Sequence, residues 1–66
     1  MKTEPYITLG QFLKHQSIIS TGGEAKAFLL QNSVQVNGQE EKRRGRKLWL
    51  NDSVTINNEV YVVTSV

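Results

Sequence analysis

The sequence TGGEAKAFLLQNSVQVNG, residues 21–38, predicts a helix that leads directly into a β-hairpin. Thr21 and Glu24 have the spacing of a capping box, in which each side chain accepts the backbone N–H of the other at the start of a helix. Apolar residues then recur from Ala25 at the i, i+3, i+4 spacing of a single helix face. The helix is expected to end at Asn32, because asparagine tolerates the left-handed conformation that follows many helices.

A strand and a tight turn follow this helix. Val34-Gln35-Val36 alternates apolar and polar residues, as a strand with one buried face does. Asn37-Gly38 comes next, and this pair strongly indicates a hairpin because both turn positions need a positive φ. Part of the polar stretch 39–46 is expected to return as the second hairpin strand or to run as an extended loop.

The flanking segments predict an α+β fold with two short helices packed on one face of a small, mostly antiparallel sheet. Thr8 and Gln11 form a further capping box, so a first helix is expected over about 8–16. Later strands and turns are expected at 48–50, 51–52, 54–56, 57–58 and 61–63. The expected core consists of Leu9, Phe12, Leu13, Ala25, Phe28, Leu29, Val34, Val36, Leu48, Leu50, Val54 and Ile56.

Length and composition indicate one small domain, residues 1–66. A chain of this size buries only about 60% of its unfolded surface, which leaves little room for a deep substrate cavity. It has no cysteine and one histidine, His15, so no disulfide, metal site or other cofactor is expected. No apolar run approaches the roughly 20 residues that span a bilayer. The first five residues lack the apolar stretch of a signal peptide, so a cytoplasmic location is expected.

The positive charge is concentrated in KRRGRK, residues 42–47, which we call the basic segment. The basic segment carries +5 and the rest of the chain −3, which gives the net charge of +2. Charge that is localised in this way is typical of a surface that binds a polyanion. A solvated loop of like charges or a targeting patch would have the same composition.

Residues 21–38 resemble the core of the RNA-binding domain first described in ribosomal small-subunit protein S-four, also called the alpha-L motif. Glu24-Ala25-Lys26 and Val34-Gln35-Val36-Asn37-Gly38 match the helix and the hairpin of that family without a gap. Asn51-Asp52-Ser53-Val54 is similar to its Gly-Asp-x-Val turn. The resemblance covers about residues 8–56, and residues 43–48 look like the short stand-alone bacterial members.

The resemblance implies RNA contacts from the start of the second helix and from the adjoining hairpin and loop. The sequence departs from the family pattern at Gly22 and Lys26, where arginine is usual, and at Asn51, which replaces a turn glycine. We expect part of the contact surface to move to the basic segment. The residues expected to bind RNA are Thr21, Gly22, Gly23, Lys26, Asn37, Lys42, Arg43, Arg44, Arg46, Lys47 and Trp49.

Two of these assignments have an alternative interpretation. The free N–H groups at the second helix start favour phosphate, and Gly22 and Gly23 would let it approach, but Glu24 lies there too and the glycines could simply shape a turn. On a strand, Trp49 would face the same side as Lys47 and could stack on an unpaired base. Alternatively, Trp49 covers a small apolar patch, which we favour slightly.

No pattern in the sequence supports catalysis. Glu40 and Glu41 are adjacent, so on a strand they would point to opposite faces and could not act as an acid–base pair. We therefore expect a small, monomeric, non-catalytic protein that binds structured RNA, either ribosomal or transfer RNA. The ribosome and its assembly intermediates are candidate partners. An assembly module whose basic segment docks on an acidic protein is the alternative, and DNA is a third partner that charge alone does not exclude.

Overall fold

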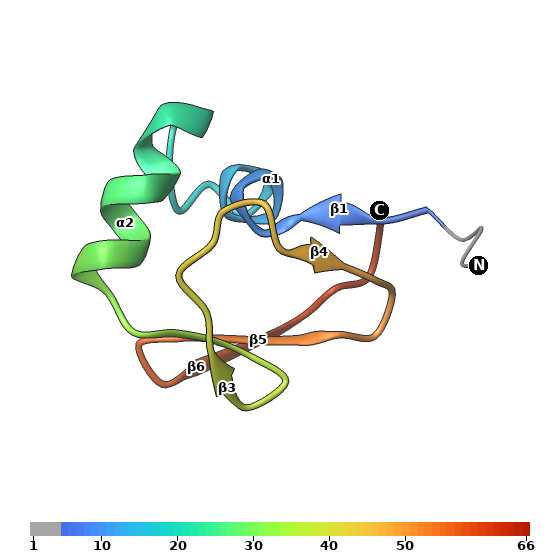
Figure 1. The fold of residues 1–66 in the computed structure, drawn as a ribbon. Helices are drawn as coiled ribbons and strands as arrows, with labels where there is room; N and C mark the ends of the chain where they lie inside the picture. Colours follow the sequence, from blue (N-terminus) through green and yellow to red (C-terminus); the bar gives the residue numbers. More distant parts are fainter. Residues whose placement is uncertain (1–4) are drawn as a thin grey trace.

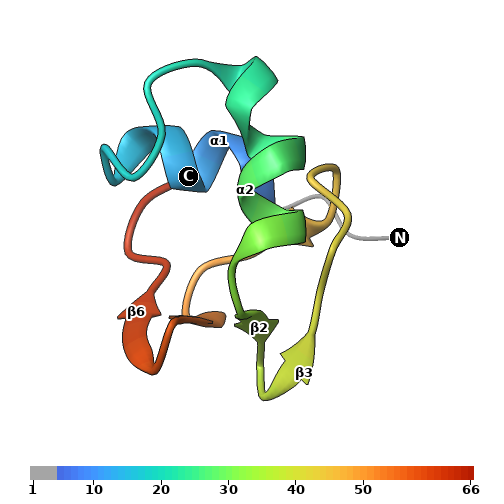
Figure 2. The same ribbon diagram turned by 90° about the vertical axis from the view of Figure 1, so that its left-hand side faces the viewer.

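A computed structural model describes residues 5–66, and in it the helices lie on one side of a four-stranded sheet (Figures 1 and 2). Residues 1–4 lie outside the described range. The elements in chain order are β1 (Ile7–Thr8), α1 (Leu9–His15), the 3-10 turn η1 (Gly22–Glu24), α2 (Ala25–Gln31), β2 (Val34–Val36), β3 (Gln39–Glu40), β4 (Lys47–Leu48), β5 (Ser53–Ile56) and β6 (Glu59–Val62). The α+β class is as predicted. None of these helices is long and apolar enough to cross a membrane.

The strands form two antiparallel sheets instead of the single sheet expected. The larger sheet has the order β3-β2-β5-β6, and the smaller one pairs β1 with β4. The expected strand at 48–50 is wrong beyond Leu48. Backbone N–H of Trp49 donates to the Asp52 carboxylate at 2.8 Å, and Asn51 has a φ of 75°, so the chain turns there.

Two asparagine turns join the strands of the larger sheet as predicted. Asn37 and Gly38, between β2 and β3, have φ values of 51° and 85°. Asn57 and Asn58, between β5 and β6, have values of 49° and 72°. Positive φ at both central positions matches the right-handed twist of the strands, which is why these short turns form hairpins.

The two predicted capping boxes have different outcomes. At α1, Thr8 Oγ1 accepts the Gln11 N–H at 3.2 Å, and Gln11 Oε1 accepts the Thr8 N–H at 3.0 Å, which confirms the first box. The second box is wrong, because the Thr21 side chain caps nothing. Glu24 Oε2 instead accepts the N–H of Ser20 at 2.9 Å. Residues 22–24 consequently form the 3-10 turn η1, and α2 begins only at Ala25.

The end of α2 also differs from the expected left-handed cap. Asn32 is extended, with φ −129° and ψ 157°. Its side-chain Nδ2 donates to the Phe28 carbonyl at 3.0 Å, and its Oδ1 accepts from Asn57 Nδ2 at 3.0 Å. The Phe28 carbonyl also accepts the Asn32 backbone N–H at 3.0 Å, so the Asn32 side chain adds a second donor there and connects α2 to the β5–β6 turn.

The core lies between the helices and the larger sheet and contains ten of the twelve residues predicted for it. Phe28 is only half-buried, at the edge of this core. The prediction that Leu50 belongs to the core is wrong, since the residue lies beyond β4 and is 52% exposed. Among residues 5–66, three buried hydrophobic residues were not predicted: Ile7, Ile19 and Val63. Val63 lies just beyond β6, and its N–H donates to the Asp52 carbonyl at 2.9 Å.

Leu48 and Leu50 provide a matched test of this arrangement. Leu48→Ala removes a fully buried side chain and should lower the free energy of unfolding by about 2–5 kcal/mol. Leu50→Ala removes a side chain already half in solvent and should cost less than about 1 kcal/mol. Urea unfolding followed by circular dichroism measures both. Equal losses in the two variants would contradict the end of the strand at Leu48.

Candidate nucleic-acid interface

The backbone of the basic segment is attached to the start of α1. Leu9 N–H donates to the Arg46 carbonyl at 2.8 Å, and Gly10 N–H donates to the Arg44 carbonyl at 2.9 Å. The first N–H groups of a helix have no partner within the helix, so these two bonds satisfy groups that would otherwise need water. They continue the hydrogen-bond ladder between β1 and β4. Because they involve only backbone carbonyls of the basic segment, its cationic side chains stay available for other contacts.

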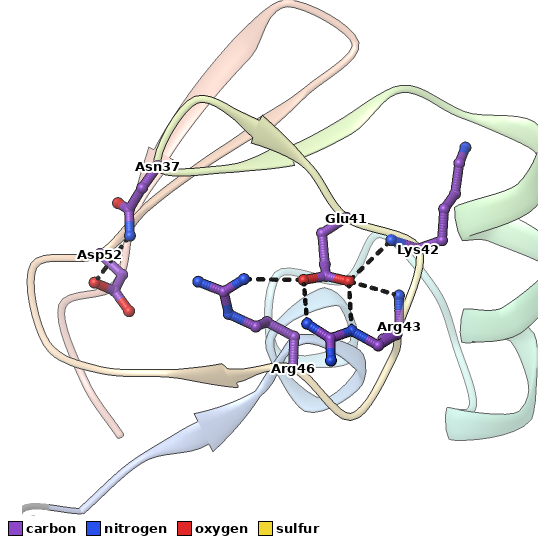
Figure 3. Close-up of polar contacts among 6 residues, drawn as sticks. All are labelled: Asn37, Glu41, Lys42, Arg43, Arg46 and Asp52. Carbon is purple, nitrogen blue, oxygen red and sulfur yellow. Dashed lines mark hydrogen bonds and ion pairs between the residues drawn. The ribbon is translucent and has the colours of Figure 1, made fainter.

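Glu41 lies immediately before the basic segment, and its carboxylate organises it (Figure 3). One oxygen, Oε2, accepts the backbone N–H groups of Lys42 at 3.2 Å and Arg43 at 3.1 Å, as well as Arg43 Nε at 3.0 Å. The other oxygen accepts from Arg43 Nη2 at 3.2 Å and from Arg46 Nη1 at 2.9 Å. Only 8% of the Glu41 side chain is exposed. The carboxylate therefore faces the interior of the segment and not the solvent.

These contacts change the ionisation of Glu41. Hydrogen bonds from the Arg43 side chain, followed by those from the Arg43 backbone and Arg46, lower the pKa of the Glu41 carboxyl from 4.5 to about 2, although burial acts in the opposite direction. The same ion pair raises the pKa of Arg43. Glu41 is consequently a carboxylate at any physiological pH, and it offsets part of the repulsion between its cationic neighbours.

The remaining cations of the segment have different surroundings. Lys42 Nζ donates to the Leu29 carbonyl at the end of α2 at 2.9 Å and lies 3.8 Å from a Glu40 carboxylate oxygen. Lys47 Nζ lies 5.0 Å from the centre of the Tyr6 ring. Arg44 is exposed, and its guanidinium has no hydrogen-bond or ion-pair partner among residues 5–66. Of the cations in the basic segment, Arg44 and Lys47 thus have no carboxylate partner among residues 5–66.

An open hollow of about 670 Å³ adjoins the segment. It is lined by Asn37, Arg43, Gly45, Arg46, Lys47, Trp49 and Asp52. Arg46 extends from Glu41 toward the side of the hollow that holds Asn37 and Asp52 (Figure 3). Asn37 Nδ2 donates to Asp52 Oδ1 at 3.3 Å, and Asn37 Oδ1 accepts the Ser53 N–H at 2.9 Å. The hollow therefore has one cationic wall and one wall of hydrogen-bonded turn residues.

Trp49 lines the hollow but also has a packing role. It is half-buried, and its ring centre lies 5.3 Å from that of Tyr6 in a tilted arrangement. The prediction that Trp49 shares a strand face with Lys47 is wrong, because β4 ends at Leu48. Both side chains nevertheless line the hollow. The contact with Tyr6 agrees with the interpretation of Trp49 as a cover over a small apolar patch.

The residues predicted at the second helix start lie outside the hollow. Thr21, Gly22, Gly23 and Lys26 are exposed on η1 and α2. Ala25, the first residue of α2, lies near the basic segment, because a Cβ placed on Gly10 would lie 3.5 Å from the Cβ atoms of both Ala25 and Arg44. The structure therefore brings Asn37, Arg43, Arg46, Lys47 and Trp49 to the hollow and leaves Thr21, Gly22, Gly23 and Lys26 outside it.

Sequence reasoning missed Glu41 and Asp52 as parts of this surface. It did place Glu40 and Glu41 on opposite faces, and the side chains are indeed 66% and 8% exposed. The sequence did contain a signal for this contact, because Glu41 precedes Arg43 by two residues and Arg46 by five. A buried carboxylate needs a partner, so nearby arginines were its natural candidates.

The sequence is similar to a known family and to a curated protein. The S4 domain, a sequence family, matches residues 1–64. A relative from Bacillus subtilis (strain 168), described as "Probable ribosome maturation protein RlbA", is 54% identical over 50 residues. The aligned part covers 76% of this chain and 70% of the relative. No solved structure gives a significant match.

Arg46 and Arg44 separate the structural role of the segment from its charge. Arg46→Ala removes a hydrogen bond to the buried carboxylate of Glu41 and should lower the free energy of unfolding by about 1–2 kcal/mol. Arg44→Ala removes an equal charge but no hydrogen bond to a carboxylate, and it should change the free energy of unfolding by less than about 0.5 kcal/mol. Thermal unfolding of both variants measures the difference. Equal stabilities would show that the Glu41–Arg46 contact contributes nothing to folding.

The lowered pKa of Glu41 predicts a specific pH dependence. The folded value of about 2 is below the ordinary 4.5, so the stabilisation is complete above pH 4.5 and is lost as the pH falls toward 2. In Glu41→Gln this component is absent. The difference in unfolding free energy between wild type and variant should therefore shrink by about 1–3 kcal/mol between pH 5 and pH 2. A constant difference over this range would exclude Glu41 as the titrating group.

Proposed function

The chain belongs to the S4 domain family, and we propose that it is a non-catalytic RNA-binding protein that contacts structured RNA through the basic segment. The family and the relative described as a ribosome maturation protein support an RNA-binding, ribosome-related role. That description favours ribosomal RNA over transfer RNA as the ligand. The observation that carries the proposal is the attachment of a cationic segment to the start of α1, beside an open hollow.

Phosphate neutralisation is the main physical contribution that this surface can make. Three arginines lie in the basic segment, and the guanidinium group matches phosphate through paired N–H donors. Double-helical RNA hides its base edges in a deep, narrow groove, so proteins recognise it largely through its shape and its backbone. A cationic surface with a defined backbone geometry is suited to that kind of recognition.

The helix-start residues would extend the same contact surface. Lys26 is exposed on α2, and Gly22 leaves open space around its Cα. Arg44 lies near the first residue of α2, since a Cβ placed on Gly10 would lie 3.5 Å from the Cβ atoms of both Arg44 and Ala25. We propose that RNA bound at the basic segment continues past Arg44 toward Lys26. Glu24 adds a negative charge there, so the basic segment supplies the larger part of the attraction.

The salt dependence of binding tests this proposal. If Arg43, Arg44, Arg46 and Lys47 each contact one phosphate, the logarithm of the affinity for a ribosomal RNA fragment should fall with the logarithm of salt concentration with a slope of roughly −3 to −4. Arg44→Ala should reduce that slope by about one. Lys14→Ala removes a similarly exposed cation from the last turn of α1 and is the matched control, with an unchanged slope.

Two further measurements distinguish RNA from an acidic protein partner. Added ribosomal RNA should shift the backbone amide signals of residues 21–26 and 42–49 together. Ribonuclease should abolish co-sedimentation with ribosomes. Equal salt slopes for Arg44→Ala and wild type would contradict a phosphate contact at Arg44 and overturn the proposed contact surface. Association with a protein fraction that survives ribonuclease would favour docking on an acidic protein.

A further inference from the structure

The basic segment contains an apparent contradiction, because a carboxylate lies at the centre of a surface proposed to bind a polyanion. A negative charge within several ångströms of bound phosphates repels them. Its removal should then improve binding by about twofold on electrostatic grounds alone. The contacts of Glu41 indicate the opposite outcome.

Glu41 determines the conformation of the segment as well as its charge. It accepts the backbone N–H groups of two successive residues, Lys42 and Arg43, and so sets the direction in which the chain leaves β3. The chain then turns back, with Arg46 N–H donating to the Arg43 carbonyl at 3.2 Å. Arg43 and Arg46, two residues that line the hollow, meet at one carboxylate as a result of this turn.

The arginines keep donors for a ligand while they are held. Glu41 takes Nε and Nη2 of Arg43 but only Nη1 of Arg46. Arg43 remains 76% exposed and Arg46 34% exposed, whereas Glu41 is 8% exposed. A guanidinium has five N–H donors, so both side chains can still donate to phosphate. The negative charge is covered by the two groups that it orients.

We propose that Glu41 is a positioning residue for RNA binding, which holds Arg43 and Arg46 in the conformation that contacts RNA. The inference rests on the proposed function of the basic segment. Flexible side chains lose conformational freedom when a ligand orders them, and this loss weakens binding. Glu41 brings about that ordering before the ligand arrives. Removal of its negative charge therefore weakens RNA binding instead of strengthening it.

Glu40 is a natural matched control for this inference. It is the adjacent residue, it carries the same charge, and its side chain is 66% exposed. Its one ion pair among residues 5–66 is the 3.8 Å contact with Lys42. Glu40→Gln and Glu41→Gln therefore change the net charge of the protein equally, at neighbouring positions, but only the second disturbs the arginines.

The test is to measure the affinity of the full chain for a ribosomal RNA fragment, over the same series of salt concentrations, in wild type, Glu40→Gln and Glu41→Gln. Glu40→Gln should bind about twofold tighter because a repulsive charge is removed. Glu41→Gln should bind about fivefold weaker, since the ordering of two arginines costs more than the lost repulsion gains. Its salt slope should stay that of wild type, because the same phosphates are contacted.

The motion of the arginine side chains distinguishes a positioning role of Glu41 from a role in folding alone, because loss of fold stability by itself would leave that motion unchanged. The Nε–H signals of Arg43 and Arg46 should show restricted motion in wild type and increased motion in Glu41→Gln. The amide signals of β2 and β5 should stay in place. If Glu41→Gln does not fold, Glu41→Asp replaces it. This variant keeps the charge but withdraws the carboxylate by one methylene, and it should also weaken binding about fivefold.

The outcomes separate the inference from the function on which it rests. RNA binding by wild type that tightens equally in Glu40→Gln and Glu41→Gln would overturn the positioning role and leave the proposed function intact. Rigid arginine signals in a weakened Glu41→Gln would overturn it too. Absence of RNA binding in wild type and Glu40→Gln alike would overturn the proposed function itself.

Discussion

The two hydrogen bonds from the start of α1 to the carbonyls of Arg44 and Arg46 are the constraint on which the surface of this protein depends. They satisfy helix N–H groups that have no partner within α1, so the helix and the basic segment stabilise each other. They also connect the β1–β4 pair to the layer of helices. A polar segment that repels itself is thereby held as an ordered part of a very small fold.

Charge in this protein is concentrated but partly compensated. Five cations within six residues would repel each other strongly if they were all exposed and unpaired. Glu41 pairs with Arg43 and Arg46, while Lys42 is held by a helix carbonyl and lies near Glu40. Arg44 and Lys47 remain without a carboxylate partner among residues 5–66. The segment therefore combines oriented arginines with less constrained cations on one surface.

The family fold explains where this surface lies. The larger sheet and the two helices enclose the core, and the residues between β3 and β4 pass the start of α1 (Figures 1 and 2). Asn37 and Asp52 form the opposite wall of the hollow, and Asp52 accepts hydrogen bonds from the Trp49 backbone and the Asn37 side chain. Elements distant in sequence thus supply the two walls of one candidate binding site.

The sequence by itself determined the elements whose stabilising contacts are local. The Thr8–Gln11 box, the Asn37-Gly38 and Asn57-Asn58 turns and the alternation in β2 involve residues close together along the chain. Only the tertiary structure decided which sheet Leu48 joins, since its partner Ile7 is 41 residues away. It likewise decided the exposure of Leu50 and which of the two adjacent glutamates, Glu40 or Glu41, is buried. Burial depends on what packs from elsewhere in the chain, and no local pattern contains that information.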